Sequence, residues 1–440
     1  MKLIFQKKHI VFSLWLFSFI YIAIYLVSEF IFHIDMYLLL IFFVVSNLSI
    51  LFVSMTKRDY LSPNALFIVS VLIFILIRPI LSGIGDFEVI SIGLKINVLN
   101  ITKAVVFTMV TVNVIAMTAL LSSSRIERYY NFIPKINIFN NYIEVLFFSF
   151  AILFSLYFLY MSYLGMLKLA SGMDYFKFTV SGAYDHLQYF FISKLCYLIS
   201  YLFSKRKIGI VMIASCCFFT SIGFIIIGLR GYTVAYLFLF LSIINLRYKL
   251  KIFPLIIVAA ALLMISSVVL NFRLGYNVTS SYIDMLVSPF HQQGASFEVV
   301  FGAVNFRDEL ITCISFIDYF LKEDFGSCVD KVRGVYFSEG GGFASSYFAE
   351  VYYLGILPAI FISIVFGISL SFLSSAYVRL RENIYSDKLS GVIVFLLVPN
   401  LVYFARSSAF DFVIKMVQVL ILVLLILLFK RLMPKNVPSS

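Results

Sequence analysis

Twelve long apolar runs alternate with polar gaps along the whole chain, and this alternation is the main structural signal in the sequence. A helix needs about 20 mainly apolar residues to cross a bilayer core about 30 Å thick, and the runs are close to that length. The expected spans cover residues 10–28, 36–55, 65–82, 104–122, 143–164, 189–204, 208–228, 232–246, 252–270, 350–375, 390–405 and 410–429. The pattern therefore predicts an all-α polytopic membrane protein with about 12 transmembrane helices.

Lysine and arginine gather in every second gap between these runs. Of the 34 basic residues, 20 lie in such clusters, 11 lie in the other gaps, and Arg78, Lys194 and Lys415 lie within the runs. Because basic loops stay on the inner side of a membrane, both termini are predicted to be cytoplasmic. The net charge of +12 is then explained by basic loops on the inner side, where they contact anionic membrane lipid. Nucleic acid is therefore not an expected partner.

Composition supports one integral membrane domain over residues 1–440. Hydrophobic residues make up 62% of the chain and charged residues only 13%, against about 25% charged in a typical soluble domain. The first run has no small-residue cleavage site, so it is expected to be an uncleaved anchor. Residues 271–345 differ from the rest because charged side chains are dense there, and they form the predicted large extracytoplasmic loop before span ten.

One segment of this loop has helical periodicity. Leu310, Ile314, Ile317 and Leu321 recur at helical spacing, and Asp308 stands where a helix cap is expected. The pattern predicts an amphipathic helix that rests on the membrane surface. A lid that packs on the helix bundle is the alternative.

The five cysteines fall into two groups. Cys313 and Cys328 both lie in the outer loop, where an oxidising compartment permits a disulfide, so pairing and free thiols both stay open. Cys196, Cys216 and Cys217 lie in spans and receive no role. The sequence shows no Cys/His cluster with metal-ligand spacing and no glycine-rich phosphate loop, so neither a metal nor a cofactor is expected.

Four arginines are predicted to lie at the outer membrane boundary: Arg78, Arg230, Arg273 and Arg406. An arginine that is partly sunk in the bilayer costs roughly 2.5–3.5 kcal/mol on insertion scales, so it generally has a partner or a function. Since the guanidinium group suits phosphate oxygens and stays protonated, these residues are candidate ligands of a lipid diphosphate. The alternative is that they reach toward the interface or pair helices.

The loop also holds candidates for acid–base chemistry and glycan contact. His291 lies in a polar, turn-prone segment beside Gln292 and Gln293, so it is a candidate base for a sugar hydroxyl, and the two amides are candidate glycan ligands. A purely structural histidine is the alternative. The carboxylates that compete for the role of base are those of Glu298, Glu339 and Glu350.

A glycine-rich segment precedes span ten. The glycines at 340–342 allow a ligand to approach the backbone closely. Ser346, Tyr347 and Glu350 follow on one face of the next predicted helix, which makes Ser346 and Tyr347 candidate glycan ligands and Glu350 a candidate catalytic residue. Aromatic residues that simply mark the membrane interface are the alternative.

The glycine-rich segment, the Ser-Ser-Tyr-x-Ala-Glu stretch at 345–350, the aromatic pair Tyr352 and Tyr353, and the Leu-Arg-Gly turn at 229–231 resemble Wzy-type O-antigen polymerases. The resemblance implies a bundle of about a dozen helices that polymerises undecaprenyl-diphosphate-linked oligosaccharide repeat units at the outer face of the bacterial inner membrane. It also implies that arginines hold the diphosphate and that no nucleotide sugar is used. A chain-length regulator is a further candidate partner.

Two other functions remain open at this level. A lipid-linked oligosaccharide flippase also has about twelve helices, but it should carry ionisable residues toward the membrane midplane, where Lys194 and Lys415 are the main candidates. A ligase that attaches finished glycan to the lipid A core uses similar chemistry, and only its acceptor differs.

Overall fold

The structure is a computed structural model. It describes residues 2–30, 34–56, 59–84, 98–134, 139–170, 187–204, 208–226, 230–251, 294, 296–314, 328, 346–382 and 387–432. In these residues every regular element is helical. The elements are α1 (Lys2–Phe30), α2 (Ile34–Thr56), α3 (Pro63–Val71), η1 (Leu72–Leu76), α4 (Ile77–Ile84), α5 (Val98–Phe132), α6 (Asn141–Ala170), α8 (Leu187–Phe203), α9 (Ile208–Ile226), α10 (Arg230–Tyr248), α13 (Ser296–Asn305), α14 (Arg307–Cys313), α17 (Tyr347–Leu354), α18 (Ile356–Glu382), α19 (Lys388–Tyr403), η3 (Phe404–Arg406) and α20 (Asp411–Leu432).

Within this part of the chain, ten helical segments are long and apolar enough to cross a membrane, and α8 is a shorter apolar helix. Together they account for eleven of the twelve expected spans, and span three is built from α3, η1 and α4 in succession. The remaining expected span, 252–270, falls outside the described residues. The prediction of a helical, multi-pass membrane protein is confirmed, while the total of twelve spans and the cytoplasmic termini stay predictions.

The expected boundary of span ten is wrong. The apolar run at 350–375 is divided in the structure, because α17 ends at Leu354 and the long apolar helix α18 begins only at Ile356. Gly355 separates them with a φ of 94°, a conformation that glycine adopts easily and other residues rarely. Glu350 therefore belongs to a short helix before the span and not to the span itself.

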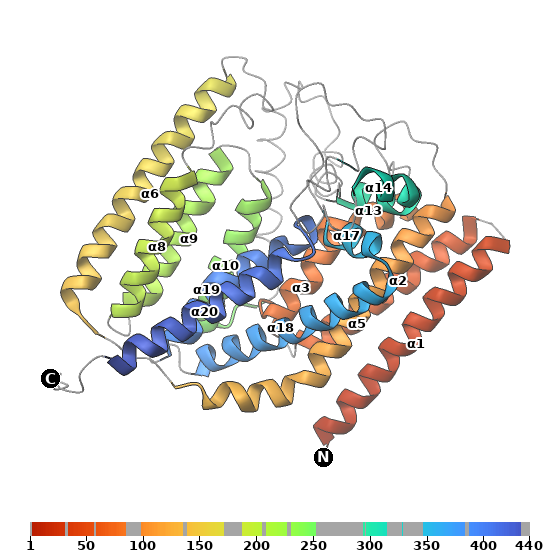
Figure 1. The fold of residues 1–440 in the computed structure, drawn as a ribbon, viewed down its shortest axis with the longest axis horizontal. Coiled ribbons are helices and arrows are strands. Elements are labelled where there is room, and N and C mark those ends of the chain that lie inside the picture. The colour runs from red at the N-terminus through yellow and green to blue at the C-terminus, as the bar shows by residue number, and fades with distance from the viewer. Residues whose placement is uncertain are drawn as a thin grey trace.

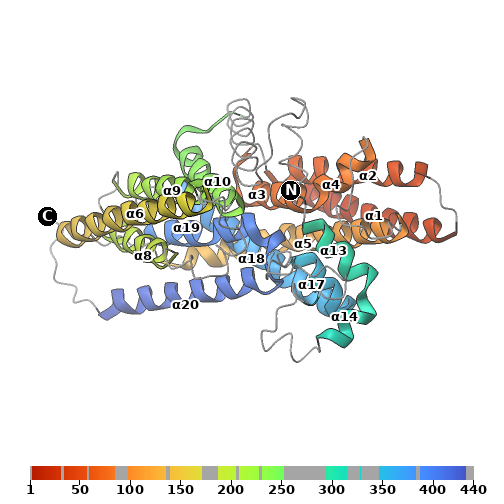
Figure 2. The same cartoon turned by 90° about the horizontal axis from the view of Figure 1, so that it is seen from above.

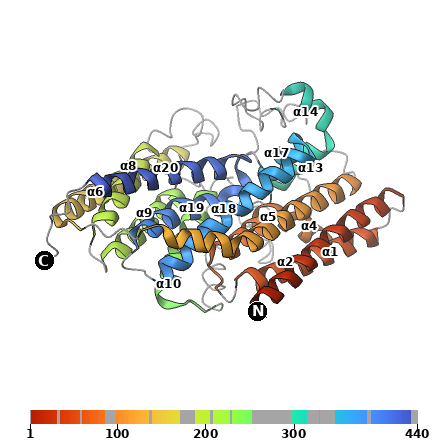
Figure 3. The same cartoon turned by 60° about the horizontal axis from the view of Figure 1, so that its bottom comes forward.

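The bundle has two groups of helices that are joined by α18 and α19 (Figures 1 and 2). One group contains α1 to α5 and the other contains α6 and α8 to α10. Helix α18 packs on α5 and α3, while α19 packs on α10, α8 and α3. Figure 3 shows the same central position of α18 and α19 from another side. Helix α19 therefore contacts both groups directly, and α18 packs on α19.

Polar contacts at one end of the bundle join the gaps that carry the basic clusters. Lys7 Nζ donates to Ser123 Oγ at 2.6 Å, and Lys388 Nζ donates to Ser204 Oγ at 2.8 Å. Arg379 forms an ion pair of 2.7 Å with Asp387, which also caps the start of α19. These contacts bring together the gaps that the charge pattern assigns to one membrane side.

The gaps that are predicted to lie on the outer side meet at the other end. Arg78 pairs with Glu298 of α13, and the Tyr353 hydroxyl donates to the Ile314 carbonyl at 2.5 Å. Helices α13, α14 and α17 accordingly lie close together at the upper right of Figure 1. The described part of the large loop is thus folded onto the bundle.

The predicted amphipathic helix is shorter than its pattern. Helix α14 ends at Cys313, the next residue, Ile314, is extended, and Ile317 and Leu321 lie outside the described residues. Asp308 is not the cap, because the helix begins at Arg307 after Phe306 and receives no side-chain cap.

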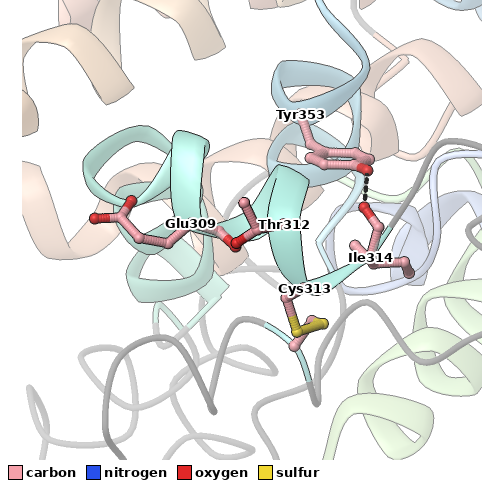
Figure 4. Close-up of a disulfide and its surroundings, with 6 residues drawn as sticks. Glu309, Thr312, Cys313, Ile314 and Tyr353 are labelled. Carbon is pink, nitrogen blue, oxygen red and sulfur yellow. Dashed lines mark hydrogen bonds between the residues drawn. A yellow bond between two sulfur atoms is a disulfide. The ribbon is translucent and has the colours of Figure 1, made fainter.

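The packing of this segment favours the lid over the membrane-surface helix. The side chains of Leu310 and Ile314 are fully buried, and the Tyr353 contact to Ile314 ties the end of α14 to α17 (Figure 4). The apolar positions of the pattern therefore face protein in the part that is described.

A disulfide joins Cys313 at the end of α14 to Cys328, which settles the alternative that the sequence left open (Figure 4). The three cysteines in the spans, Cys196, Cys216 and Cys217, are buried free thiols, as expected. The crosslink joins two cysteines that are 15 positions apart in the sequence, next to the contact between α14 and α17.

Two measurements test this crosslink. With a maleimide polymer in SDS, we expect three labels before reduction and five after it, so the span cysteines serve as an internal control. Replacing Cys313 by serine should lower the free energy of unfolding of the outer segment by about 3 kcal/mol, because a loop of this length then regains its freedom in the unfolded state. Five labels without reductant would contradict the disulfide.

Candidate active site

Arg78 lies in a buried ion pair at the outer end of the bundle. It follows η1, a single π-helical turn of a kind that is frequent at functional sites. The guanidinium pairs with the carboxylate of Glu298, and their side chains are 5% and 0% exposed. Gly294 packs against the side chains of Ile77 and Arg78, and a β-carbon there would lie 2.7 Å from a carbon of each. The pair therefore attaches the start of α13 to span three.

Arg406 lies at the corner between α19 and α20. It is the last residue of η3, and its guanidinium lies over the rings of Phe74 and Tyr403, with centroid distances of 5.7 and 6.0 Å. Rings at this distance attract a cation and restrict its position. Because Phe74 belongs to η1, Arg406 and Arg78 come from neighbouring parts of the structure.

Arg406 lines a pocket of about 340 Å³ that we call the Arg406 pocket. Its walls come from α10, α19, η3 and α20. The lining residues are Tyr232, Tyr236, Pro399, Asn400, Tyr403, Arg406, Ser407, Ser408, Asp411, Phe412 and Lys415. Two cations and one carboxylate leave a positive excess, and the stacked rings of Tyr232 and Tyr403, with centroids 4.9 Å apart, add aromatic side chains to the lining.

The start of α10 lies against the same pocket. Arg230 is the first residue of this helix, and the next residue, Gly231, packs so close to Tyr403 that a β-carbon would lie 2.5 Å from the ring. Helix α20 begins at Asp411 in the pocket wall as well. The N–H groups at a helix start carry partial positive charge, so two helix starts and two basic side chains converge here.

Helix α17 supports the corner that carries Arg406. Glu350 is 1% exposed, and it accepts hydrogen bonds from Ser408 Oγ at 2.7 Å and from the Ala409 amide at 2.9 Å. Ser346 Oγ donates to the Ala405 carbonyl at 3.2 Å. These bonds lie on both sides of Arg406 and favour a positioning role for both residues. The catalytic role of Glu350 and the glycan contact of Ser346 stay predictions.

Tyr347 is fully buried among the rings of Phe348, Phe366 and Phe404. Burial raises the pKa of its hydroxyl above the ordinary value of 10.0, so the group stays protonated. A core position of this kind favours a structural role over contact with a glycan, and the predicted glycan contact remains untested.

Several predicted site residues fall outside the described residues. These are Arg273, His291, Gln292, Gln293 and the glycines at 340–342. Of the four predicted arginines, the structure brings Arg78, Arg406 and the helix start at Arg230 into one region. Tyr232, Tyr403 and Asp411 also line the pocket, and none of them was predicted as a site residue from the sequence. The spacing of Tyr403 and Arg406, three residues apart, is the signal that points to a shared face.

Lys415 does not lie near the membrane midplane, where a flippase would need an ionisable residue. It is exposed at the Arg406 pocket, four residues after the start of α20, and its Nζ donates to Gln418 at 3.2 Å. This position is close to the predicted outer end of the bundle. It does not supply the midplane charge that a flippase pathway would need.

A second polar pocket, of about 190 Å³, lies at the opposite end between α1, α2, α3, α5 and α18. Its lining includes the ion pair between Arg381 and Asp59, together with Lys7 and Glu127, so its charges balance. This pocket lies among the basic gaps, on the predicted cytoplasmic side. The Arg406 pocket is therefore the better candidate for an anionic ligand on the outer side.

Two comparisons with known proteins point in the same direction, and no solved structure matches the chain. A family model described as O-antigen polysaccharide polymerase Wzy matches residues 331–437, a range that contains α17 to α19, the Arg406 corner and α20. An O-antigen polymerase of Escherichia coli is 40% identical over 371 residues, which cover 82% of each chain. With this likeness over most of its length, the chain belongs to the O-antigen polymerase family.

Proposed function

We propose that the protein polymerises O-antigen repeat units, and that its donor is a glycan linked to a lipid diphosphate at the outer face of the bacterial inner membrane. The observation that carries this proposal is the 40% identity to an O-antigen polymerase over most of both chains. The Arg406 pocket adds a physical reason, since its lining combines a positive excess with aromatic side chains at the end of the bundle that the charge pattern predicts to be the outer one.

The reaction needs no nucleotide, because the donor carries its own leaving group. A hydroxyl oxygen of the acceptor repeat unit forms a bond to the anomeric carbon of the growing glycan, and the bond from that carbon to the diphosphate oxygen breaks. The electron pair leaves with the lipid diphosphate, whose charge is stabilised by fixed cations and amide dipoles. Arg406, Lys415 and the starts of α10 and α20 are the described groups that are suited to this task.

Other site roles are divided as follows. Arg230 and Arg273 are proposed as further diphosphate ligands, and His291 as the base that takes the proton of the acceptor hydroxyl. Arg78 already forms an ion pair with Glu298. We therefore propose that its main role is to hold span three against α13, and that binding of the diphosphate is a secondary role. Glu350 already accepts two hydrogen bonds at the Arg406 corner, which makes it a weaker candidate for the base than His291.

The test is the lipopolysaccharide pattern of a strain that lacks this gene. We expect the ladder of polymerised O-antigen to be replaced by one band, the lipid A core with a single repeat unit, because transport and ligation still operate. Complementation with the intact gene should restore the ladder. A strain with only bare core would contradict polymerisation: repeat units trapped on the inner leaflet would indicate a flippase, and polymer left on the carrier lipid would indicate a ligase.

A further inference from the structure

Lys194 is an ammonium group inside the membrane-embedded part of the bundle. It lies in α8, donates from Nζ to the Tyr236 hydroxyl at 2.9 Å, and sits over the rings of Phe190, Tyr236 and Phe395 at 6.0, 5.4 and 5.6 Å. In the part of the chain that the structure describes, no carboxylate forms an ion pair with it. A cation that a bundle keeps within a span without an opposite charge generally marks a functional site.

The partner of Lys194 connects it to the Arg406 pocket. Tyr236 lies in the wall of that pocket and is 4% exposed. At 1.5 Å per residue, Tyr236 lies about 9 Å below the start of α10, and Lys194 about 10 Å below the start of α8. Both therefore lie in the half of the bundle that is predicted to face outward, with Tyr236 in the pocket wall and Lys194 bonded to it.

The chemistry of the pair determines where the Tyr236 hydrogen points. An ammonium group has donors only, so the Tyr236 oxygen must accept in the bond with Lys194. The hydroxyl hydrogen of Tyr236 must then point away from Nζ. Among the described residues no acceptor takes this hydrogen, and the pocket is the space beside the ring that a ligand can occupy.

We propose that Lys194 is a positioning residue of the Arg406 pocket, which holds the Tyr236 hydroxyl as a donor toward an oxygen of the lipid diphosphate. The ammonium also adds a third positive charge beneath Arg406 and Lys415. This inference rests on the proposed function, because it assumes that a diphosphate occupies the pocket. It assigns to Lys194 and Tyr236 a role in recognising that group.

The experiment measures binding of undecaprenyl diphosphate to the full chain in nanodiscs, with phosphatidylglycerol as a competitor that lacks the diphosphate. Tyr236→Phe and Lys194→Met should each weaken binding about tenfold, the size of loss that follows removal of a hydrogen bond to a charged group. The double variant should lose no more than the larger of the two single losses, because both changes remove the same donor. Lys194→Arg should retain binding, since arginine also has donors only.

A matched control is Lys103→Met. Lys103 lies in the first turns of α5, which starts before the expected span at 104, so the structure places a second lysine in an apolar helix. Its Nζ lies over the rings of Tyr25 and Tyr352 at 5.9 and 6.0 Å, and it does not line the pocket. Its replacement should leave diphosphate binding unchanged. A tenfold loss in this control as well would mean that the loss at Lys194 is an unspecific effect of charge, and the proposal would fall.

Three further outcomes would overturn the inference. One is normal binding by Tyr236→Phe, which decides the matter even if Lys194→Met fails to fold. Another is a double variant whose fold-loss of binding affinity equals the product of the fold-losses of the two single variants. The third is normal binding by Lys194→Met. Arg406→Ala in the same assay separates the two proposals, because loss there with normal binding by Tyr236→Phe removes only the role of Lys194. Normal binding by Arg406→Ala removes the pocket itself as the diphosphate site.

Discussion

Polymerisation is expected to fall about a hundredfold when Arg406 is replaced by alanine, the usual size of effect when a fixed donor to a developing negative charge is lost. The rings of Phe74 and Tyr403 hold the guanidinium at the pocket wall, so its removal takes a fixed cation from the pocket. Arg406→Lys should recover only part of the activity, since a compact ammonium cannot copy two parallel bonds to phosphate oxygens. The rate at which labelled repeat units enter polymer in membrane vesicles measures the effect.

Arg128 provides the matched control. It lies near the end of α5 on the predicted cytoplasmic side and is exposed. Arg128→Lys and Arg128→Ala should both polymerise normally, because Arg125 and Lys135 still supply positive charge to that gap. Full activity of Arg406→Ala at normal abundance would reject the pocket as the diphosphate site.

Glu298→Ala is expected to destabilise the outer end of the protein by about 3–5 kcal/mol, because it leaves the buried Arg78 without this carboxylate. Marginal folding stability makes a change of that size visible as loss of protein from the membrane. Glu298→Gln should cost less, since the amide oxygen still accepts a hydrogen bond. Abundance and the melting temperature of detergent-purified protein measure both effects.

The double variant Arg78→Met with Glu298→Met separates stability from chemistry. Replacing both charges by apolar side chains often restores stability, so abundance should recover relative to Glu298→Ala. Glu309→Ala, in the exposed first turn of α14, serves as the control for loss of an outer carboxylate and should be neutral. If the double variant is as abundant as the native protein but cannot polymerise, at least one of the two charged groups also serves the reaction, as a substrate ligand in the case of Arg78 or as a base in the case of Glu298. If its abundance stays as low as that of Glu298→Ala, the ion pair is not the source of the instability.

The sequence shows span positions well because a membrane span is a property of local composition. Eleven expected spans coincide with helices, and the cysteines in spans are buried thiols. Local composition gave the wrong start for span ten, because the apolar run continues through Gly355 while the backbone turns there with a φ of 94°. It also predicted too long a helix after Asp308, since a periodic pattern of apolar residues does not show where the chain leaves the helix.

Local composition and short motifs were enough to predict a helical membrane protein, a set of arginines at its outer boundary and a family resemblance. The contacts that those residues make are visible only in the folded protein. Arg78 meets a carboxylate 220 positions away, and Lys194 meets a hydroxyl 42 positions away. Glu350 proved to support the Arg406 corner from 58 positions away. Contacts of this kind arise from the packing of helices that are distant in the chain, and no local pattern of apolar and polar residues specifies which helices pack together.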